Sequence, residues 1–553
     1  MSIARDRLQQ SGWFVFWATL FAIVHTQAPL YYSNQNQYFL HGLAQAGAGH
    51  LDQDWLANTK DPTPIFSFLV KLTARYLHEN LFYLYYAIIF GIYVASLNGI
   101  FSKLTHQANS LHPDVPDLTR LVFFTSLLLV HAAVLRWACS KAAGHDYLWY
   151  LQAGLAGQYL LGPMYQPSVH GVLLLLSVWV FLNDRPFLAV IVSSGCAVIH
   201  TTYMLSAALL TVSYLWLLLR ERRIKTAFCT GFLALAIVLP IVIWNLATFG
   251  PESAESFERA TRILAHFRIP HHAVVDYWFS RYSACQLMWL ATALCLAYGQ
   301  RLFSILVIVA AGSLILSLVQ VMTGNNTLAL LFPWRPSAFL MPICTTIILT
   351  RGIVAWKPQL LAKPRIVRGL AWTLIALALA GGAVVSWFGL NIRKDEREQA
   401  VLSFVRANSQ RGDCYLVPFH LPRPQREAIE TGQDDFGRLP RLAQKDRRIP
   451  VDFQRFRLHA RTPIHVDFKS IPYKDVEVIE WFTRLKWAHF FYKQLRSGYD
   501  PAMLDELQQR RITHVIVEAD YPPFPDDFKV LYEDAAYRVV ELPPRTAVVK
   551  AEN

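Results

Sequence analysis

Residues 226–248 read TAFCTGFLALAIVLPIVIWNLAT, and residues 302–320 read LFSILVIVAAGSLILSLVQ. Neither stretch contains a charged residue, and a helix of about 20 apolar residues is long enough to cross the hydrocarbon core of a bilayer. Further apolar stretches surround these two, so the sequence predicts eleven spans, at 12–30, 81–102, 121–139, 169–183, 187–200, 203–219, 226–248, 284–299, 302–320, 328–350 and 369–391. The short pair 187–200 and 203–219 could instead form a hairpin of partial spans.

The charged residues are distributed unevenly along the chain of 553 residues. Overall, 54% of the residues are hydrophobic and 16% are charged, which excludes a disordered or fibrous protein and favours a membrane protein. Residues 392–553 contain 27 Lys and Arg with 25 Asp and Glu, whereas residues 1–391 contain 25 and 14. The sequence therefore predicts a transmembrane module at 1–391 and a soluble domain at 392–553.

The soluble domain has alternating helix and strand patterns, which predict an α/β fold. Residues 421–450 are charged and rich in turn formers, so we expect a loop there, and no phosphate-binding loop or metal motif is visible. Acceptor recognition or a lid is the expected role of this domain. The predicted helices are 396–409, 475–496 and 501–511, and the predicted strands are 414–418, 463–468, 512–518 and a hairpin at 528–542.

Lysine and arginine are more frequent on one side of the predicted spans. With a cytoplasmic N-terminus, the inside segments contain 15 Lys and Arg against 5 Asp and Glu, and the outside loops contain 10 against 9. This bias agrees with the positive-inside rule. Eleven spans then place the C-terminal domain outside a bacterial inner membrane. The charge is a topology signal, and no clustered basic face indicates a nucleic-acid partner.

The first outside loop, residues 31–80, contains two candidate interfacial helices, near residues 33–43 and 64–79. Asp52 and Asp54 lie between them, and an extended backbone would direct both carboxylates to the same side. They could bind a divalent cation such as Mg²⁺ or Mn²⁺, or Asp54 could act as a general base. Alternatively, they solubilise the loop and cap the next turn.

Two basic segments are candidates for phosphate recognition. Arg268 suits bidentate phosphate binding, and His271 and His272 follow it, with an interfacial anchor as the alternative. Arg335 lies between two prolines near the end of a predicted span, where an unpaired cation is costly, and snorkelling to the interface is its alternative role. Lesser candidates at the same membrane face are Lys141, His145 and Asp146 in the broken apolar segment 145–167 and its flank, and His200 at the hairpin tip.

This layout resembles the GT-C superfamily of polytopic glycosyltransferases. The resemblance rests on the long first outer loop with Asp52 and Asp54, on the many spans and on the exported C-terminal α/β domain. It implies transfer of a sugar from a polyprenyl-phosphate donor to a glycan, lipid or protein acceptor at the outer membrane face. It also implies an acidic catalytic residue at Asp54, and more weakly Asp52, and basic donor-phosphate residues at Arg268 and Arg335.

Two other function classes are compatible with a polytopic membrane protein. A transporter or flippase of a lipid-linked or anionic solute predicts polar residues at the bilayer midplane and internal repeats. The midplanes here are mostly apolar, and no repeat is visible in the sequence. A non-catalytic assembly subunit predicts that replacing Asp54 has no effect on activity. The sugar-transfer hypothesis requires that acidic and basic side chains meet on the non-cytosolic side.

Overall fold

The structure is a computed structural model, and it describes residues 2–108, 117–390, 392–393, 395–432, 451 and 453–544. The chain divides into two compact units. The first unit contains residues 1–29, 79–247 and 269–392, and the second contains residues 30–78, 248–268 and 393–553. The second unit therefore combines the predicted soluble domain with the first outside loop and the segment before Ile269.

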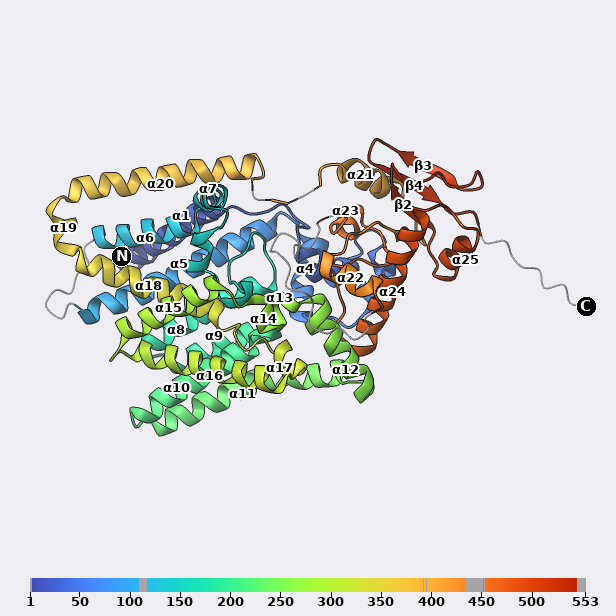
Figure 1. Cartoon of the computed structure of the whole chain (residues 1–553). Helices are drawn as coiled ribbons and strands as arrows, with labels where there is room; N and C mark the ends of the chain where they lie inside the picture. Colours follow the sequence, from blue (N-terminus) through green and yellow to red (C-terminus); the bar gives the residue numbers. More distant parts are fainter. Residues whose placement is uncertain are drawn as a thin grey trace, which may run out of the picture. The chain divides into compact units, whose positions relative to one another are not determined.

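The first unit is helical throughout its regular structure (Figure 1). Apolar side chains dominate its longer helices, as the sequence predicts. Its helices are α1 (Ser2–His25), α5 (Leu81–Ala108), α6 (Asp117–His131), α7 (Ala133–Ala143), α8 (Val172–Leu182), α9 (Pro186–Ile199), α10 (Met204–Arg220), α11 (Ile224–Phe249), α13 (Pro270–Ala273), α14 (Val275–Trp278), α15 (Arg281–Ala297), α16 (Arg301–Thr323), α17 (Asn326–Leu330), α18 (Ser337–Ala355), α19 (Lys357–Ala362) and α20 (Pro364–Trp387).

Six helices in the described residues are long and apolar enough to cross a membrane, and a seventh candidate is the pair α6 and α7, bent by 52°. The predicted spans 169–183 and 187–200 correspond to shorter apolar helices. The prediction of a polytopic helical protein is thus confirmed in outline, whereas the count of eleven and its orientation stay predictions. The six are Leu81–Thr105, Thr201–Arg220, Ile224–Phe249, Arg301–Thr323, Ser337–Ala355 and Pro364–Trp387.

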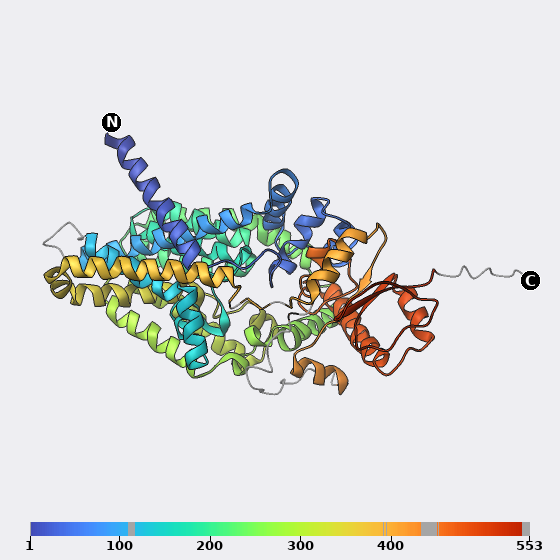
Figure 2. The ribbon, with the colours of Figure 1, turned by 90° about the horizontal axis from the view of Figure 1, so that it is seen from above.

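Apolar side chains cover much of the outer surface of this unit. On α11, the rings of Phe228 and Phe232 and the side chain of Leu246 are mostly exposed. A soluble protein rarely exposes so continuous an apolar surface, so these helices indicate a membrane protein. Helix α20, the long yellow helix in Figure 2, packs against α1, α6 and α7.

The broken apolar segment 145–167 forms short 3₁₀ turns rather than a long helix, as its glycines and proline predict. Side chains of α15 and α18 satisfy its irregular backbone. The side-chain amide of Gln286 donates to the carbonyl of Ala153 at 2.6 Å. The hydroxyl of Thr345 donates to the carbonyl of Leu151 at 2.5 Å. Irregular backbone in an apolar unit requires such partners.

The second unit mixes helices and strands. The first-loop helices expected near 33–43 and at 64–79 are present as α2 (Gln35–Tyr38) with α3 (Leu40–Gln45) and as α4 (Pro64–Tyr76). The prediction of a loop at 421–450 is wrong for residues 423–430, which form helix α22, and residues 433–450 lie outside the described residues. The other helices of the second unit are α12 (Ala254–Arg262), α21 (Glu398–Asn408), α22 (Arg423–Glu430), α23 (Phe456–Ala460), α24 (Asp475–Leu495) and α25 (Ala502–Gln509).

A small four-stranded sheet forms the β part of this unit. Its strands are β1 (Tyr415–Leu416), β2 (His514–Glu518), β3 (Lys529–Glu533) and β4 (Tyr537–Glu541), in the order β1-β2-β4-β3. Strand β1 pairs parallel to β2, and the other pairs are antiparallel. The predicted hairpin at 528–542 is confirmed, whereas the predicted strand at 463–468 is reduced to one bridge between Ile464 and Tyr415.

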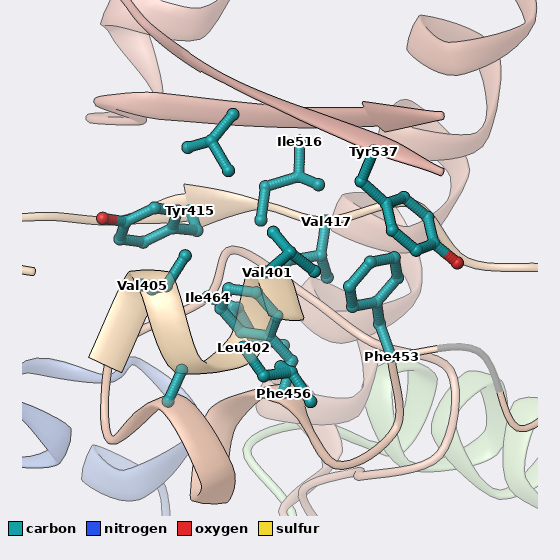
Figure 3. Close-up of a cluster of buried hydrophobic side chains, with 12 residues drawn as sticks. Val401, Leu402, Val405, Tyr415, Val417, Phe453, Phe456, Ile464, Ile516 and Tyr537 are labelled. Atoms are coloured by element: carbon teal, nitrogen blue, oxygen red, sulfur yellow. The ribbon is translucent and has the colours of Figure 1, made fainter. Parts of the chain in front are cut away.

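Helix α21 packs on one face of the sheet through apolar side chains (Figure 3). Its residues Val401, Leu402 and Val405 contact Ile516 of β2 and Val539 of β4 in one buried cluster. The spacing of the three helix residues directs them to one side, and the period of two in each strand directs its partner to that side. The α/β character of the C-terminal part follows from these two periodicities.

Hydrogen bonds join the first loop to the C-terminal segment within the second unit. The side-chain amide of Gln37 donates to the carbonyl of Ile471 at 2.7 Å and accepts from its backbone N–H at 2.5 Å. The backbone N–H of His50 donates to the carbonyl of Arg461 at 2.9 Å. Segments that are distant in the sequence therefore share one buried backbone network.

Close packing of α5 against α8 requires glycine at position 99. A methyl group there would overlap the indole ring of Trp179. We expect Gly99→Ala to lower the free energy of unfolding by about 1–3 kcal/mol, the usual effect of overpacking. Thermal unfolding in detergent measures the change. Gly195→Ala in α9 is the matched control, because nothing lies within 4 Å of its added methyl group. Equal unfolding temperatures for Gly99→Ala and the natural chain would contradict this packing.

Candidate functional site

The carboxylate of Asp54 is completely buried and fully hydrogen-bonded. One oxygen accepts from the backbone N–H groups of Leu56 and Ala57, at 2.9 and 3.3 Å. The other accepts from the guanidinium Nε of Arg457 at 2.7 Å and from the backbone N–H of Ile464 at 3.0 Å. Four donors thus occupy both oxygens. This geometry supports a positioning role for Asp54 rather than that of a general base.

Arg457 of α23 bridges two buried carboxylates. Its Nε contacts Asp54, and its second guanidinium nitrogen contacts Asp467 at 2.5 Å. Burial alone would lower the pKa of Arg457, but the two carboxylates outweigh burial and raise it. Asp467 also accepts from the backbone N–H of Ser470 at 2.6 Å, and its carbonyl accepts from the indole of Trp481 at 2.9 Å. Asp467 is therefore also held in place, by two donors to its carboxylate and one donor to its carbonyl.

Arg268 ends a π-helix, Ile263–Arg268, which continues α12. Such short π-helical turns are frequent at functional sites. The preceding Phe267 fixes the turn, because its carbonyl accepts from Gln425 at 2.9 Å and its ring packs against Phe482. The guanidinium of Arg268 lies 5.1 Å from the ring centre of Phe468. Arg268 therefore lies in the interior of the second unit, where it is 6% exposed.

Arg268 and Lys469 are neighbouring cations. One guanidinium nitrogen of Arg268 donates to the carbonyl of Lys469 at 2.5 Å, but its buried Nε has no partner among the described residues. The hydroxyl of Ser470 is buried and likewise lacks a described partner. Burial, followed by the charge of Arg268, lowers the pKa of the Lys469 amine to about 7, although Asp467 opposes the shift. We call Arg268, Lys469 and Ser470 the anion cluster.

The charges around the anion cluster do not cancel. Asp54 and Asp467 supply two negative charges, and both pair with Arg457. Protonated Lys469 and Arg268 add two further positive charges, and within the described residues no carboxylate lies in ion-pair distance of either. Three cations therefore face two anions. An incoming anion would restore neutrality and accept from the free N–H of Arg268 and the free hydroxyl of Ser470.

Asp52 is separated from this network. It lies in a 3₁₀ helix, Leu51–Gln53, and its partly exposed carboxylate pairs with Arg411 at 2.8 Å. The expectation of an extended backbone with both carboxylates on one side is therefore wrong, because the chain turns at Asp52. Since four N–H donors already occupy the oxygens of Asp54, the two carboxylates do not fit a shared Mg²⁺ or Mn²⁺ ion.

The other basic candidates belong to the first unit. Arg335 donates to the side-chain oxygen of Gln158 at 2.6 Å, and the amide of Gln158 contacts His272 at 2.9 Å. His271 packs beside His272, with ring centres 4.1 Å apart. Although Arg268 and His271 are close in sequence, the chain passes from the second unit to the first between them. His271 and His272 therefore belong to the same unit as Arg335, whereas Arg268 belongs to the other unit.

The lesser candidates have local partners or stay at the surface. Asp146 pairs with Arg136 at 2.8 Å and caps the following 3₁₀ turn. His145 packs against Tyr282, with ring centres 4.8 Å apart, while Lys141 is exposed in the last turn of α7. His200 is buried at the end of α9. A catalytic role for these residues stays a prediction.

The sequence patterns identified Arg268 as a phosphate-binding candidate, but they did not identify Asp467 or the hydroxyl of Ser470. A signal was present, because the segment HVDFKSI, residues 465–471, places polar and charged residues in an otherwise apolar run. All seven are buried except Lys469, which is half-buried. Charged residues inside a buried run mark sites that require partners or a ligand.

Comparison with known proteins gives one family match. Residues 447–488 match a family described as Domain of unknown function (DUF6798). The matched stretch contains Arg457, Asp467 and Lys469, which form most of the buried network. No curated protein matches the chain.

The network predicts that Asp54 is needed for folding. Asp54→Asn directs an amide N–H₂ at existing donors and leaves Arg457 with one carboxylate, so we expect a loss of about 3–5 kcal/mol in the free energy of unfolding. Asp52→Asn is the matched control, since an exposed pair contributes about 1 kcal/mol or less. Thermal unfolding of the purified full chain measures both. Equal stability of the two variants would refute the structural role.

Lys469 makes stability depend on pH. Its protonation is less favourable in the folded chain than in the unfolded chain, where the pKa is about 10.4. Lys469 therefore destabilises the fold below pH 7, and this penalty disappears as pH rises towards about 10. We expect Lys469→Met to unfold at a higher temperature than the natural chain at about pH 6 and at a similar temperature near pH 10. Lys493→Met, at an exposed lysine, is the control. An increase in the unfolding temperature of Lys469→Met that is the same at both pH values would contradict the lowered pKa of Lys469.

Proposed function

We propose that the chain is an integral-membrane glycosyltransferase that moves a sugar from a polyprenyl-phosphate donor to an acceptor at the outer membrane face. The observation that carries the proposal is the anion cluster, in which Arg268 and Lys469 have no carboxylate partner among the described residues. The apolar helices of the first unit support a membrane-borne donor. The resemblance to the GT-C superfamily supplies the reaction class.

The electrostatics of the anion cluster suit such a reaction. The acceptor oxygen bonds to the anomeric carbon of the sugar, and the bond from that carbon to the phosphate oxygen breaks. The electron pair stays on the phosphate, and the proton of the acceptor hydroxyl goes to a general base. The phosphate thereby changes from a singly charged diester to a more highly charged monoester. Arg268 and protonated Lys469 stabilise this developing charge more than that of the donor.

The contacts of Asp54 change its place in the proposal. Its carboxylate holds Arg457, and Arg457 holds Asp467, whose chain leads directly to Lys469 and Ser470. Asp54 thus acts as a positioning residue for the anion cluster. The base that takes the acceptor proton is a different group.

The topology expected from the sequence is part of the proposal. Eleven spans with a cytoplasmic N-terminus would place the C-terminal domain outside the cytoplasm, in the inner membrane of a bacterium. The excess of Lys and Arg in the inside segments supports this orientation. An acceptor glycan, lipid or protein would then approach from the extracytoplasmic side.

Donor cleavage by the full chain in proteoliposomes tests the function. The vesicles contain polyprenyl-phosphate-linked radiolabelled sugars, with a membrane extract as the source of acceptor. We expect the natural chain to transfer label and Arg268→Gln to transfer about 100-fold less, the usual effect of losing one donor to a transition-state oxyanion. Arg262→Gln is the matched control, because Arg262 is a half-buried arginine of the same segment that already pairs with Glu258 at 2.7 Å.

Other outcomes of this assay identify other functions. Passage of the intact lipid-linked sugar across the bilayer without cleavage would establish a flippase instead. Absence of both cleavage and passage would favour an assembly subunit. Undiminished transfer by Arg268→Gln would show that the anion cluster does not hold the donor phosphate.

A further inference from the structure

Arg335 is an arginine of the first unit, and its charge has no counter-ion among the described residues. It precedes α18 and lies half-buried, with its guanidinium carbon 4.8 Å from the ring centre of Tyr203. One terminal nitrogen donates to Gln158 at 2.6 Å. The Nε of the same guanidinium is buried and makes no hydrogen bond to a described residue.

Other arginines of the same unit have oxygen partners. Arg136 pairs with Asp146 at 2.8 Å, and Arg301 pairs with Glu221 at 2.9 Å. Arg351, near the other end of α18, donates two N–H groups to the carbonyl of Leu296. Buried Nε atoms without a described hydrogen-bond partner also occur in Arg120 and Arg301, although Arg301 has a carboxylate counter-ion. The Nε edge of Arg335 requires an explanation, because a buried charge without a counter-ion is costly.

Unpaired polar atoms occur in the segment of Tyr203, the residue on which Arg335 stacks, and in its hydrogen-bond partner Ser168. The hydroxyls of Thr202 and Ser206, on the same segment, are buried without a described partner. Ser168, whose carbonyl accepts from the Tyr203 hydroxyl at 2.6 Å, also has a buried unpaired hydroxyl. Buried hydroxyl groups without a described partner thus occur next to Tyr203 in the chain and at its hydrogen-bond partner, and no carboxylate among the described residues pairs with Arg335. This combination is complementary to a polar anion.

We propose that Arg335 binds the phosphate group of a membrane phospholipid. The Nε edge of a guanidinium is planar and binds two phosphate oxygens side by side. Tyr203 and Arg335 lie at the ends of two candidate membrane spans, Thr201–Arg220 and Ser337–Ala355, and the ends of a span lie at the level of the lipid headgroups. The site lies in the first unit and is independent of the anion cluster and of sugar transfer.

Photo-crosslinking of the full chain tests this assignment. The probe is phosphatidylglycerol with a photoreactive diazirine beside its phosphate, presented in vesicles of phosphatidylcholine. We expect labelled peptides to include residues 200–206 or 332–337. Arg335→Gln should reduce this labelling about tenfold or more, and Arg335→Lys should restore part of it. Arg351→Gln is the matched control and should label normally, because Arg351 already has a carbonyl partner.

The outcomes separate the possible ligands. Competition by unlabelled phosphatidylglycerol supports the proposal. Stronger competition by polyprenyl phosphate would mean that Arg335 binds the sugar donor. Full competition by millimolar inorganic phosphate would mean that it binds a free anion. Either result overturns the proposal. If Arg335→Gln fails to fold, the peptide map of the natural chain decides. Labelling that avoids both peptides overturns the proposal.

Discussion

Arg457, buried between Asp54 and Asp467, is the interaction on which the second unit depends. Its two partners come from the first loop and from the segment after α23, so one guanidinium joins parts of the chain that are 403 residues apart. Because both carboxylates pair with Arg457, Asp467 offsets the charges of Arg268 and Lys469 only in part. The same contact thus stabilises the assembly of the unit and leaves an excess of positive charge beside it.

That excess is the basis for the proposed function. A protein that needed stability alone would place a carboxylate or an apolar group beside Arg268, since burying like charges together is unfavourable. Strongly shifted groups with a specific charged neighbour are enriched at functional sites. The cluster is also pre-organised, because Phe267 anchors the π-helix and Asp467 fixes the backbone of Ser470. A phosphate that enters would meet donors already in place.

Local sequence patterns predicted much of the fold. Helix α24, at Asp475–Leu495, and the hairpin of β3 and β4 follow from periodicity and turn residues in short windows. The sequence did not predict that residues 30–78 belong with the C-terminal part, because the pairing of Gln37 with Ile471 leaves no local signal. For the same reason Asp54 looked like a catalytic carboxylate. Its buried partner Arg457 is distant in sequence, and only the folded chain reveals that its oxygens are occupied.

The most direct test of the anion cluster is the pKa of the Lys469 amine, measured with and without phosphate. Nuclear magnetic resonance of the full chain with ¹³C-methylated lysines, with Lys469→Arg to assign the signal, gives this value. We expect titration near neutral pH in the free chain and a rise in the pKa of about one unit or more when short-chain polyprenyl phosphate is added. An ordinary lysine pKa of about 10.4 in the free chain, or a value that polyprenyl phosphate leaves unchanged, would contradict an anion-binding role for the cluster.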